Sequence, residues 1–347
     1  MNTINLCLIG KGTVGTCLLN LLNNREKEFN EKFGISFKVK AIFEYDGALL
    51  NENGLDLGLI LNKEQDFREL DDWKENIRAI NYLSKINVDM CIDTTPTNAE
   101  SGEPALSHIK EALKNHIDVV TSNKAPFFLQ YKELHELAKK NKCYIKYDAA
   151  VASCVPSLSI ADDLIANKIT KIKAILNGTS NYILSRMSAE GVEFSLALKE
   201  AQELGYAEAD PTLDIEGYDA AGKLVILANE LLNWSKSIND VKIRGITNIT
   251  PQAINLAKAD GYVIKHLAIA KDKSLIVEPR LVKNNSSLNI KGTKNLIQIE
   301  TEYAGPIILI GRGAGGYEAA AAILNDILAI LNIRGKVKNS KSSLDKT

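Results

Sequence analysis

The sequence predicts an α/β protein, with a mostly parallel sheet in its first half and a separate α+β unit in its second half. Up to about residue 150, short apolar runs alternate with segments of helical periodicity, which is typical of a parallel sheet with helices on both faces. In the second half, residues 168–176 alternate lysine with apolar residues, as a half-buried strand of an open sheet does. The 347 residues correspond to about two domains of roughly 150 residues each.

The first predicted element gives the clearest signal. Residues 4–9 form an apolar run of strand length, the glycine-rich turn GKGTVG (residues 10–15) follows, and apolar residues then recur at helical spacing. In a dinucleotide-binding fingerprint, Gly10 would make the tight turn, Gly12 would admit a pyrophosphate, and Gly15 would let the helix pack closely. We therefore predict a Rossmann-type nucleotide-binding domain; a purely structural turn is the alternative.

The second predicted strand, residues 37–43, indicates which nucleotide binds. It ends at Glu44, and Asp46 follows closely. Either carboxylate could accept hydrogen bonds from a ribose diol, which favours NAD. No arginine adjoins these acids in the sequence to hold a 2′-phosphate, although lysines lie nearby, so NADP stays open as the alternative. Residues 45–81 are polar and glycine-containing, with some helical character.

Two further predicted strands end in polar loops. Strand 88–92 leads into Asp93-Thr94-Thr95-Pro96-Thr97, and strand 117–120 leads into Thr121-Ser122-Asn123-Lys124-Ala125-Pro126. Ligands of open α/β sheets bind at the carboxyl ends of the strands. Lys124 could therefore donate to a substrate or cofactor oxygen, although an ordinary loop lysine fits the pattern equally well. Helices near 104–114 and 130–140 and a strand at 143–147 complete this half.

Beyond residue 150 we expect a different unit. Its predicted strands and helices are strands 168–176, 262–270, 274–282 and 305–310, and helices 181–187, 195–204 and 219–232. An apolar helix at 318–331 is expected to pack back on the first domain. The expected division is a nucleotide-binding domain at 1–150 completed by a helix at about 316–335, a substrate and dimerisation domain at 151–315, and a polar tail at 336–347.

The segment from Gly205 to Lys223 carries the densest chemistry. Five carboxylates fall between Glu208 and Asp219. Asp219 and Lys223 are four residues apart, so they share one face of the following helix, and that face continues into apolar residues. This predicts a buried pair, and burial suits a lysine to proton transfer. A surface ion pair, worth only a few tenths of a kcal/mol, is the alternative.

Three other features allow two interpretations each. Residues 177–181 (NGTSN) start a helix, and either Thr179 or Ser180 caps it or its backbone donors hold a carboxylate. The glycine-rich run at 311–316 is either a flexible loop or a phosphate or nicotinamide contact. Cys154 has no histidine near it in the sequence, so we expect a small buried thiol rather than a nucleophile.

Composition excludes several classes of protein. The formal net charge of −1 offers no bulk attraction to nucleic acid or to an anionic membrane. There is no run of about 18 apolar residues, and no basic segment precedes the apolar N-terminus, so a secretory signal is not expected. The five cysteines include no CxxC pair, which is typical of a reducing cytoplasm without disulfides or a zinc cluster.

Taken together, these motifs resemble homoserine dehydrogenase. GKGTVG, DTTPT, TSNKAP, ILNGTSNYIL, GYAEADPTLDIEGYDAAGKL and GRGAGG occur in the order of that family and cover nearly the whole chain. The resemblance implies reversible, NAD(P)-dependent interconversion of L-homoserine and L-aspartate 4-semialdehyde in threonine, methionine and isoleucine biosynthesis. It also implies a homodimer acting on a small molecule.

The resemblance assigns residues to three groups. Lys223 matches the proton donor and acceptor, and Lys124 matches a second active-site lysine. The substrate pocket corresponds to Glu208, Asp214, Asp219, Gly178 and Thr179. The cofactor contacts correspond to Gly10, Gly12, Thr13, Val14, Gly15, Thr94, Thr95, Lys124, Gly205 and Gly315.

The sequence departs from the family in three places. The family has a glutamate and a VGxGxP turn that hold a monovalent cation, Na⁺ or K⁺, whereas this chain has Asp148 and would offer Val151, Ser153 and Val155. After GRGAGG it has Tyr-Glu-Ala in place of the family's Pro-Thr-Ala. It also ends before an appended ACT domain, so feedback inhibition through one is not expected.

Two other functions fit parts of the pattern. A phosphorylating semialdehyde dehydrogenase would use Cys154 as its nucleophile, but no candidate base is evident. A non-catalytic NAD(P)-binding sensor would need only the first domain, and the Asp219–Lys223 pair argues against it.

Overall fold

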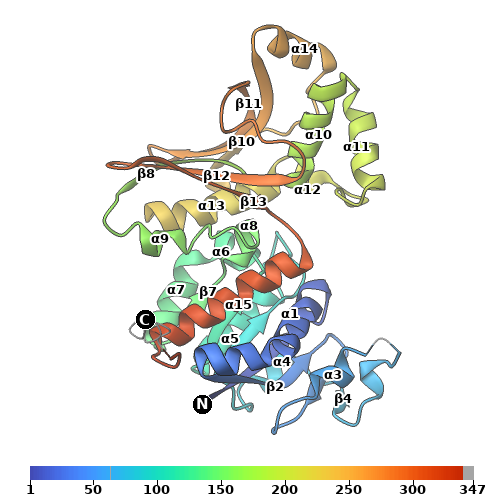
Figure 1. Cartoon of the computed structure of the whole chain (residues 1–347), viewed down its shortest axis with the longest axis vertical. Helices are drawn as coiled ribbons and strands as arrows, with labels where there is room; N and C mark the ends of the chain where they lie inside the picture. Colours follow the sequence, from blue (N-terminus) through green and yellow to red (C-terminus); the bar gives the residue numbers. More distant parts are fainter. Residues whose placement is uncertain (63, 339–347) are drawn as a thin grey trace, which may run out of the picture. The chain divides into compact units, whose positions relative to one another are not determined.

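The computed structural model describes residues 1–62 and 64–338, and these divide into two compact units (Figure 1). Unit 1 comprises residues 1–126, 132–150 and those from 315 onward, and unit 2 comprises 127–131 and 151–314. The apolar C-terminal helix α15 (Gly316–Ile333) therefore returns to unit 1, as its sequence suggested. The predicted polar tail lies mostly outside the described residues, which end at 338.

Unit 1 contains a seven-stranded sheet in the order β4-β3-β2-β1-β5-β6-β7. Its parallel strands are β1 (Asn2–Ile9), β2 (Ile35–Phe43), β5 (Met90–Asp93), β6 (Asp118–Thr121) and β7 (Ile145–Lys146). At one side of the sheet the antiparallel strand β3 (Gly47–Leu50) pairs with β2, and β4 (Trp73–Glu75) forms the edge. Both lie in the region for which the sequence predicted no strand. Both strands are too short for an alternation of polar and apolar residues to be recognised in their sequences.

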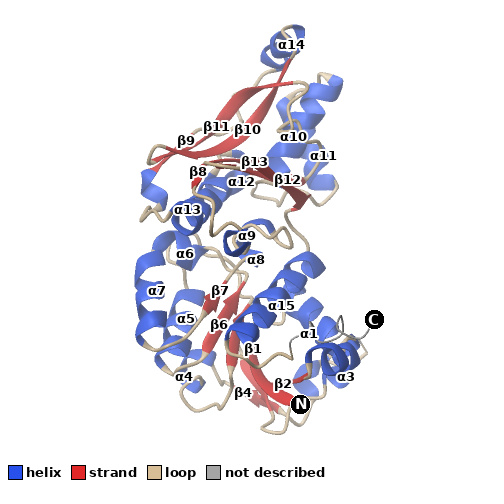
Figure 2. Cartoon of the chain, turned by 60° about the vertical axis from the view of Figure 1, so that its left-hand side comes forward, coloured by secondary structure: helices blue, strands red, loops and turns tan. Residues whose placement is uncertain are grey.

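Helices cover both faces of this sheet (Figure 2). The long helices are α1 (Thr13–Asn24), α5 (Ala105–Lys114), α7 (Tyr131–Lys140) and α15. The chain leaves β1 toward β2 on one side and β5 toward β6 on the other, so right-handed crossovers place α1 and α5 on opposite faces. The carboxyl ends of β1 and β5 are consequently the switch point at which such sheets bind ligands.

Short helical segments complete the described chain. They are α2 (Glu26–Glu28), the π-helical turn η1 (Phe29–Phe33), α3 (Leu57–Ile60), η2 (Phe67–Glu69), α4 (Ala79–Tyr82), α6 (Ala125–Leu129), α8 (Ala149–Ala152), α9 (Ile160–Asp163) and η3 (Ile238–Asp240).

Helix α15 is the most apolar of the four long helices of unit 1. Its 18 residues have a mean hydropathy of 1.3, which by length and composition alone would suit a membrane span, although half of the helix is buried within the protein. Ile323, Ile327 and Ile330 pack into the same core as Leu6 and Leu8 of β1. This burial accounts for the hydropathy as that of a core helix.

Unit 2 contains a six-stranded sheet in the order β13-β12-β8-β10-β11-β9. Its strands are β8 (Ile169–Ile175), β9 (Val241–Ile243), β10 (Tyr262–Lys271), β11 (Ser274–Lys283), β12 (Lys294–Thr301) and β13 (Gly305–Arg312). All neighbours pair antiparallel except β11 and β9. No strand was predicted from the sequence at the positions of β9 and β12.

Helix α13 (Tyr218–Leu232) lies across the middle of this sheet and packs on β8, β10 and β11 (Figure 1). Helices α10 (Gly178–Glu190) and α14 (Pro251–Ala259) pack on β10, α11 (Phe194–Glu203) packs on α10, and α12 (Thr212–Ile215) precedes α13. Nearly every residue of α13 after its first turn is buried, so a charged side chain on this helix sits inside the unit.

Candidate active site

The glycine-rich turn has the geometry of a phosphate cradle. Gly10 has a φ of +91°, a conformation that favours glycine. A Cβ on Gly15 would lie 2.2 Å from the Gly10 carbonyl oxygen, so α1 packs closely only because residue 15 is glycine. A Cβ on Gly12 would meet nothing within 4 Å. The space beside Gly12, at the start of α1, is therefore open for a ligand.

The end of β5 is tied to this turn. The Thr94 hydroxyl donates to the Gly10 carbonyl at 2.6 Å. Asp93, which is fully buried, accepts from the Thr95 hydroxyl at 2.6 Å and lies 3.0 Å from Nδ1 of His108. Thr94 and Thr95 thus occupy the switch point, and two buried side chains fix their loop.

Asn123 joins this loop to the one that carries Lys124. Its amide donates to the backbone carbonyls of Thr95 and Pro96, both at 3.1 Å, and its carbonyl accepts from the Ala125 amide at 3.2 Å. Lys124 is half-buried. Lys124 was predicted as a site residue from the sequence and Asn123 was not, although the buried Asn123 side chain links the two loops and so positions Lys124.

An arginine lies beside the acids at the end of β2. Arg68 pairs with Asp46 at 2.9 Å and stacks over the Phe67 ring, and Nζ of Lys11 lies 4.4 Å from the centre of the same ring. Glu44 accepts a hydrogen bond from the Lys11 backbone N–H. No arginine adjoins these acids in the sequence, but η2 brings Arg68 to Asp46 from 22 positions along the chain.

Electrostatics at this corner follow from these contacts. The hydrogen bond from Arg68 lowers the pKa of Asp46. Burial lowers the pKa of the Lys11 ammonium, and Glu44 partly offsets that effect. The corner therefore holds two cations, Lys11 and Arg68, close to the carboxylates of Glu44, Asp46 and Asp66.

The first turn of α15 lies against that of α1. A Cβ on Gly316 would lie 2.8 Å from both the Cys17 sulfur and the Thr13 methyl group. Gly315 has a φ of +133°, and the Glu318 carboxylate folds over it. Two helix N-termini, each favourable to an anion, thus meet at one place.

Unit 2 holds the predicted Asp219–Lys223 pair. The Lys223 ammonium lies 2.9 Å from the Asp219 carboxylate and donates to the Leu176 carbonyl at 2.9 Å. The two side chains are only 11% and 9% exposed, so the pair is buried, as its sequence pattern indicated.

Asn177 organises the acids around this pair. Its amide donates to Asp214 at 2.6 Å and to Asp219 at 3.0 Å, while its own carbonyl accepts from the Ser180 amide. The N-cap of α10 is therefore Asn177, not Thr179 or Ser180. Thr179 instead donates to Asp214 at 3.0 Å and to the Tyr206 carbonyl at 2.7 Å.

Two carboxyl groups, Asp214 and Asp219, share the Asn177 amide beside the Lys223 ammonium group. Burial and the nearby Asp219 raise the pKa of Asp214, whereas the hydrogen bonds from Asn177 and Thr179 act in the opposite direction. Such a pocket favours a ligand that brings a positive charge. Gly178 keeps the turn narrow, since a Cβ there would lie 2.7 Å from the Thr293 carbonyl.

Two residues depart from the expected set. Glu208 is exposed, and its backbone carbonyl, rather than its carboxylate, accepts a bond from Gln202. Asn295, which sequence reasoning missed, is 2% exposed and donates to the same Leu176 carbonyl as Lys223. Its side-chain oxygen is buried without a hydrogen-bond partner among the described residues.

Gly205, with a φ of +72°, ends the turn that follows α11 and lies beside open space.

Cys154 is exposed, which corrects the expectation of a buried thiol. Helix α8 ends at Ala152 and the φ of Ser153 is +51°, so the chain turns outward there. Within the described residues, no histidine or other base hydrogen-bonds to the thiol, and all five cysteines are free.

The segment expected to hold a cation begins at a buried pair of acids. The Asp148 amide donates to the Asp326 carboxylate at 2.9 Å. Burial and the Asp148 charge raise the pKa of Asp326 to about 7. Val151 and Val155 are also buried, and Ser153 is largely enclosed.

Comparisons with known proteins agree with this arrangement. Residues 10–148 match the model of the homoserine dehydrogenase NAD-binding domain, and residues 156–328 match the model of homoserine dehydrogenase. The homoserine dehydrogenase of Methanocaldococcus jannaschii is 43% identical over 95% of this chain and 99% of its own length. The NAD⁺-dependent homoserine dehydrogenase of Pseudomonas canavaninivorans is 35% identical over 95% and 97%.

Solved structures give the same result. An Archaeoglobus fulgidus protein assigned as a homoserine dehydrogenase superposes with a TM-score of 0.86 and 38% identity, covering 94% of this chain and 99% of its own. A hyperthermophilic archaeal homoserine dehydrogenase in complex with NADPH superposes with a TM-score of 0.82 and 26% identity over 95% and 98%. The chain therefore belongs to the homoserine dehydrogenase family, the NAD(P)-dependent oxidoreductases of amino-acid biosynthesis that interconvert L-homoserine and L-aspartate 4-semialdehyde.

Proposed function

We propose that the buried network around Lys223 is the acid–base centre of this reaction. The observation that carries the proposal is the geometry of its ammonium group. The Lys223 ammonium group can donate three hydrogen bonds, and two of them go to the Asp219 carboxylate and the Leu176 carbonyl. The third has no partner among the described residues and is left for the substrate oxygen.

The proton and hydride balance assigns Lys223 one task in each direction. In oxidation, the hydroxyl proton of L-homoserine passes to the Lys223 amine as its carbinol hydrogen leaves as hydride and the C–O bond becomes a carbonyl. In reduction, the ammonium returns that proton to the aldehyde oxygen. The nicotinamide, when bound, supplies the hydride acceptor or donor.

Asp214 and Asp219 are proposed to bind the substrate ammonium. The Asp219 side chain is buried and Asp214 is half-buried, and Asn177 and Thr179 hold the Asp214 carboxylate in a fixed orientation. A bound ammonium would offset the surplus negative charge. The turn at Gly178 and Thr179 lies beside Asp214. The Glu208 side chain is exposed, so we expect only the backbone of its loop to contribute to the pocket.

The cofactor is proposed to bind at the switch point of unit 1. The open space beside Gly12 and the first turn of α1, with Thr13 and Val14, suit its pyrophosphate. Thr94, Thr95 and Lys124 line the same rim. Gly205 and Gly315 are proposed as further cofactor contacts, on the family resemblance alone.

We propose that the chain accepts both NAD and NADP, with Arg68 favouring NADP. Glu44 and Asp46 suit a ribose diol, whereas Arg68 and Lys11 add two cations at the same corner. A homoserine dehydrogenase relative is NAD⁺-dependent and another homologue binds NADPH, so the family uses both.

Segment 148–155 is proposed to hold Na⁺ or K⁺ through Asp148 and the backbone carbonyls of Val151, Ser153 and Val155. The support is the buried negative charge of Asp148 beside Asp326. Activity assayed in tetramethylammonium, sodium and potassium chlorides tests this; equal rates in all three would contradict it.

A homodimer is proposed through the sheet of unit 2. Along β13 exposed side chains alternate with half-buried ones, and Ile308 and Ile310 are 37% and 50% exposed. Light scattering of the wild type and of Ile310→Glu tests the proposal. A monomeric wild type would contradict it.

A cytoplasmic location is proposed as well. The five free thiols support it.

The activity itself is tested by following homoserine-dependent reduction of NAD⁺ and NADP⁺ in parallel at alkaline pH. Saturable turnover with homoserine is expected, with semialdehyde as the product. Tight cofactor binding without turnover would instead favour a sensor. Phosphate-dependent acyl phosphate formation that Cys154→Ser abolishes would favour the semialdehyde dehydrogenase.

A further inference from the structure

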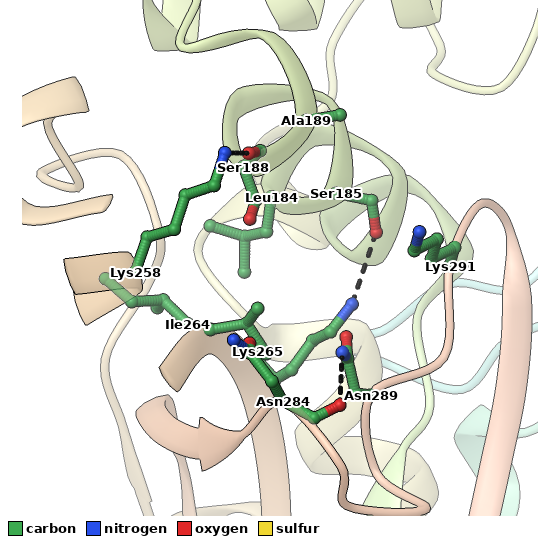
Figure 3. Close-up of a pocket in the computed structure, with 11 residues that line it drawn as sticks. Leu184, Ser185, Ser188, Ala189, Lys258, Ile264, Lys265, Asn284, Asn289 and Lys291 are labelled. Atoms are coloured by element: carbon green, nitrogen blue, oxygen red, sulfur yellow. Dashed lines mark hydrogen bonds between the residues drawn. The ribbon is translucent and has the colours of Figure 1, made fainter. Parts of the chain in front are cut away.

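A second hollow in unit 2 is lined by lysines. It has a volume of about 310 Å³ and lies among α10, α14, β10 and the loop that follows β11 (Figure 3). Lys258, Lys265 and Lys291 line it from three different elements. No carboxylate contributes to its lining. Three positive charges thus face one small space.

Lys265 is the buried member of this group. It is 2% exposed, and its ammonium donates to Asn181 at 3.0 Å, to Ser185 at 3.2 Å and to the Ile290 carbonyl. All three acceptors are neutral. They satisfy its hydrogen bonds but not its charge, and a buried charge without a counter-ion is costly.

The other two lysines add further positive charge that has no counter-ion in the lining of the hollow. Lys258 donates to the Ser188 carbonyl at 3.5 Å, another neutral partner, and Lys291 is exposed. Burial and the neighbouring Lys291 charge lower the pKa of Lys265 to about 8. An anion placed among the three ammonium groups would relieve their mutual repulsion.

The rest of the lining defines the ligand further. Ser185, Asn284 and Asn289 offer neutral hydrogen-bonding groups, and Leu184 and Ile264 supply an apolar wall. A zwitterionic amino acid would bring an ammonium group for which this hollow has no acid. The chemistry is therefore the opposite of that around Asp214 and Asp219.

We propose that this hollow is a binding site for a small oxyanion, a phosphate or carboxylate compound without an ammonium group. Lys265 forms the floor of the site, and Lys258 and Lys291 close over the bound anion. The site is separate from the Lys223 network, so the proposal does not depend on the roles assigned there.

Calorimetric titration of the whole chain with sulfate and with succinate tests the proposal. Saturating NADPH fills the phosphate sites of unit 1, and chloride keeps the ionic strength constant. One saturable site per chain is expected for at least one of the two ions. Tighter sulfate binding would identify a phosphate-type ligand, and tighter succinate binding a carboxylate. No saturable binding of either ion would overturn the proposal.

Variants locate the site. The double variant Lys258→Gln/Lys291→Gln changes lysines at the rim and should weaken binding at least tenfold. Lys199→Gln, an exposed lysine of α11 in the same unit, is the matched control and should bind as the wild type does. Equal affinity in the double variant would overturn the proposal. Lys265→Met should abolish binding, and if it does not fold, the rim variant decides.

Discussion

The candidate cofactor site of unit 1 and the candidate acid–base network of unit 2 are built from different kinds of groups. In unit 1, glycines and backbone groups shape the ligand space around Gly10, Gly12 and Gly15. In unit 2, buried side chains do so, through Asp219 and Lys223. A backbone cradle recognises the shape of its ligand, and a side chain that crowds it, as at Gly15, also destabilises the fold. A side-chain network can move charge and protons, and loss of its ionisable group is expected to leave the fold in place. Substitutions should separate these two behaviours.

The largest expected effect is that of Lys223→Ala. Loss of a positioned acid–base group lowers kcat by about 10²–10⁴-fold. Fluorescence titration should show unchanged NADPH affinity, because the cofactor cradle is built by unit 1. Lys199→Ala, on the exposed face of α11, is the control and should keep full activity. Wild-type turnover in Lys223→Ala would exclude the assigned role.

Gly15→Ala tests the backbone half. Its Cβ would lie 2.2 Å from the Gly10 carbonyl oxygen, so α1 must move, at a cost of roughly 1–3 kcal/mol. Both the denaturation midpoint and the NADPH affinity should fall.

Gly12→Ala is the matched control for that change. Its Cβ would meet no protein atom within 4 Å, so stability should stay close to that of the wild type while the cofactor affinity falls. If both variants lose stability equally, the open space beside Gly12 is not the ligand space.

Asn177→Ala removes both the N-cap of α10 and two hydrogen bonds to Asp214 and Asp219. The lost cap costs about 1 kcal/mol of stability, and disordered carboxylates should raise the KM for homoserine. Asn177→Ser restores the cap but not the amide donors. It should therefore recover the melting temperature without recovering KM; recovery of both would show that Asn177 acts only as a cap.

The pH dependence of substrate binding follows from Asp214. Burial and Asp219 raise the pKa of its carboxyl group in the free protein, and a bound ammonium stabilises the ionised form. As pH falls through this raised pKa, Asp214 takes up a proton and the KM for homoserine should rise. Asp214→Asn should have a high KM at every pH; a KM that still rises on acidification in this variant would point to another group.

The smallest effect is expected for Arg68→Gln. Loss of one charge-assisted hydrogen bond, roughly 1.5 kcal/mol, should lower kcat/KM for NADPH about tenfold and leave NADH nearly unaffected. Parallel assays with the two cofactors measure the ratio. An unchanged ratio would place the 2′-phosphate elsewhere.

Local patterns were sufficient to predict the strand–turn–helix start and the buried Asp219–Lys223 pair. In each case the spacing of a few consecutive residues determines the geometry. The return of α15 to unit 1 was predictable for a related reason, since an apolar helix must find a core.

Contacts between distant segments were not predictable. Arg68 meets Asp46, and Asn295 meets the Leu176 carbonyl, only after the chain has folded. The strands β3, β4 and β9 are held by their neighbours rather than by their own sequence period. Cys154 was wrongly predicted to be buried. The chain turns outward at Ser153, whose positive φ is not signalled in the sequence as it would be by a glycine.

Chemical rescue of Lys223→Ala tests the central claim most directly. Added primary amines can occupy the space of the missing side chain and accept the hydroxyl proton. We expect homoserine oxidation to return in proportion to amine concentration and to vary with amine pKa, with NADPH affinity unchanged throughout. Two results would contradict the assignment of Lys223 as the acid–base group. One is that neutral solutes of equal size restore activity. The other is that no amine restores activity although the fold and cofactor binding are intact.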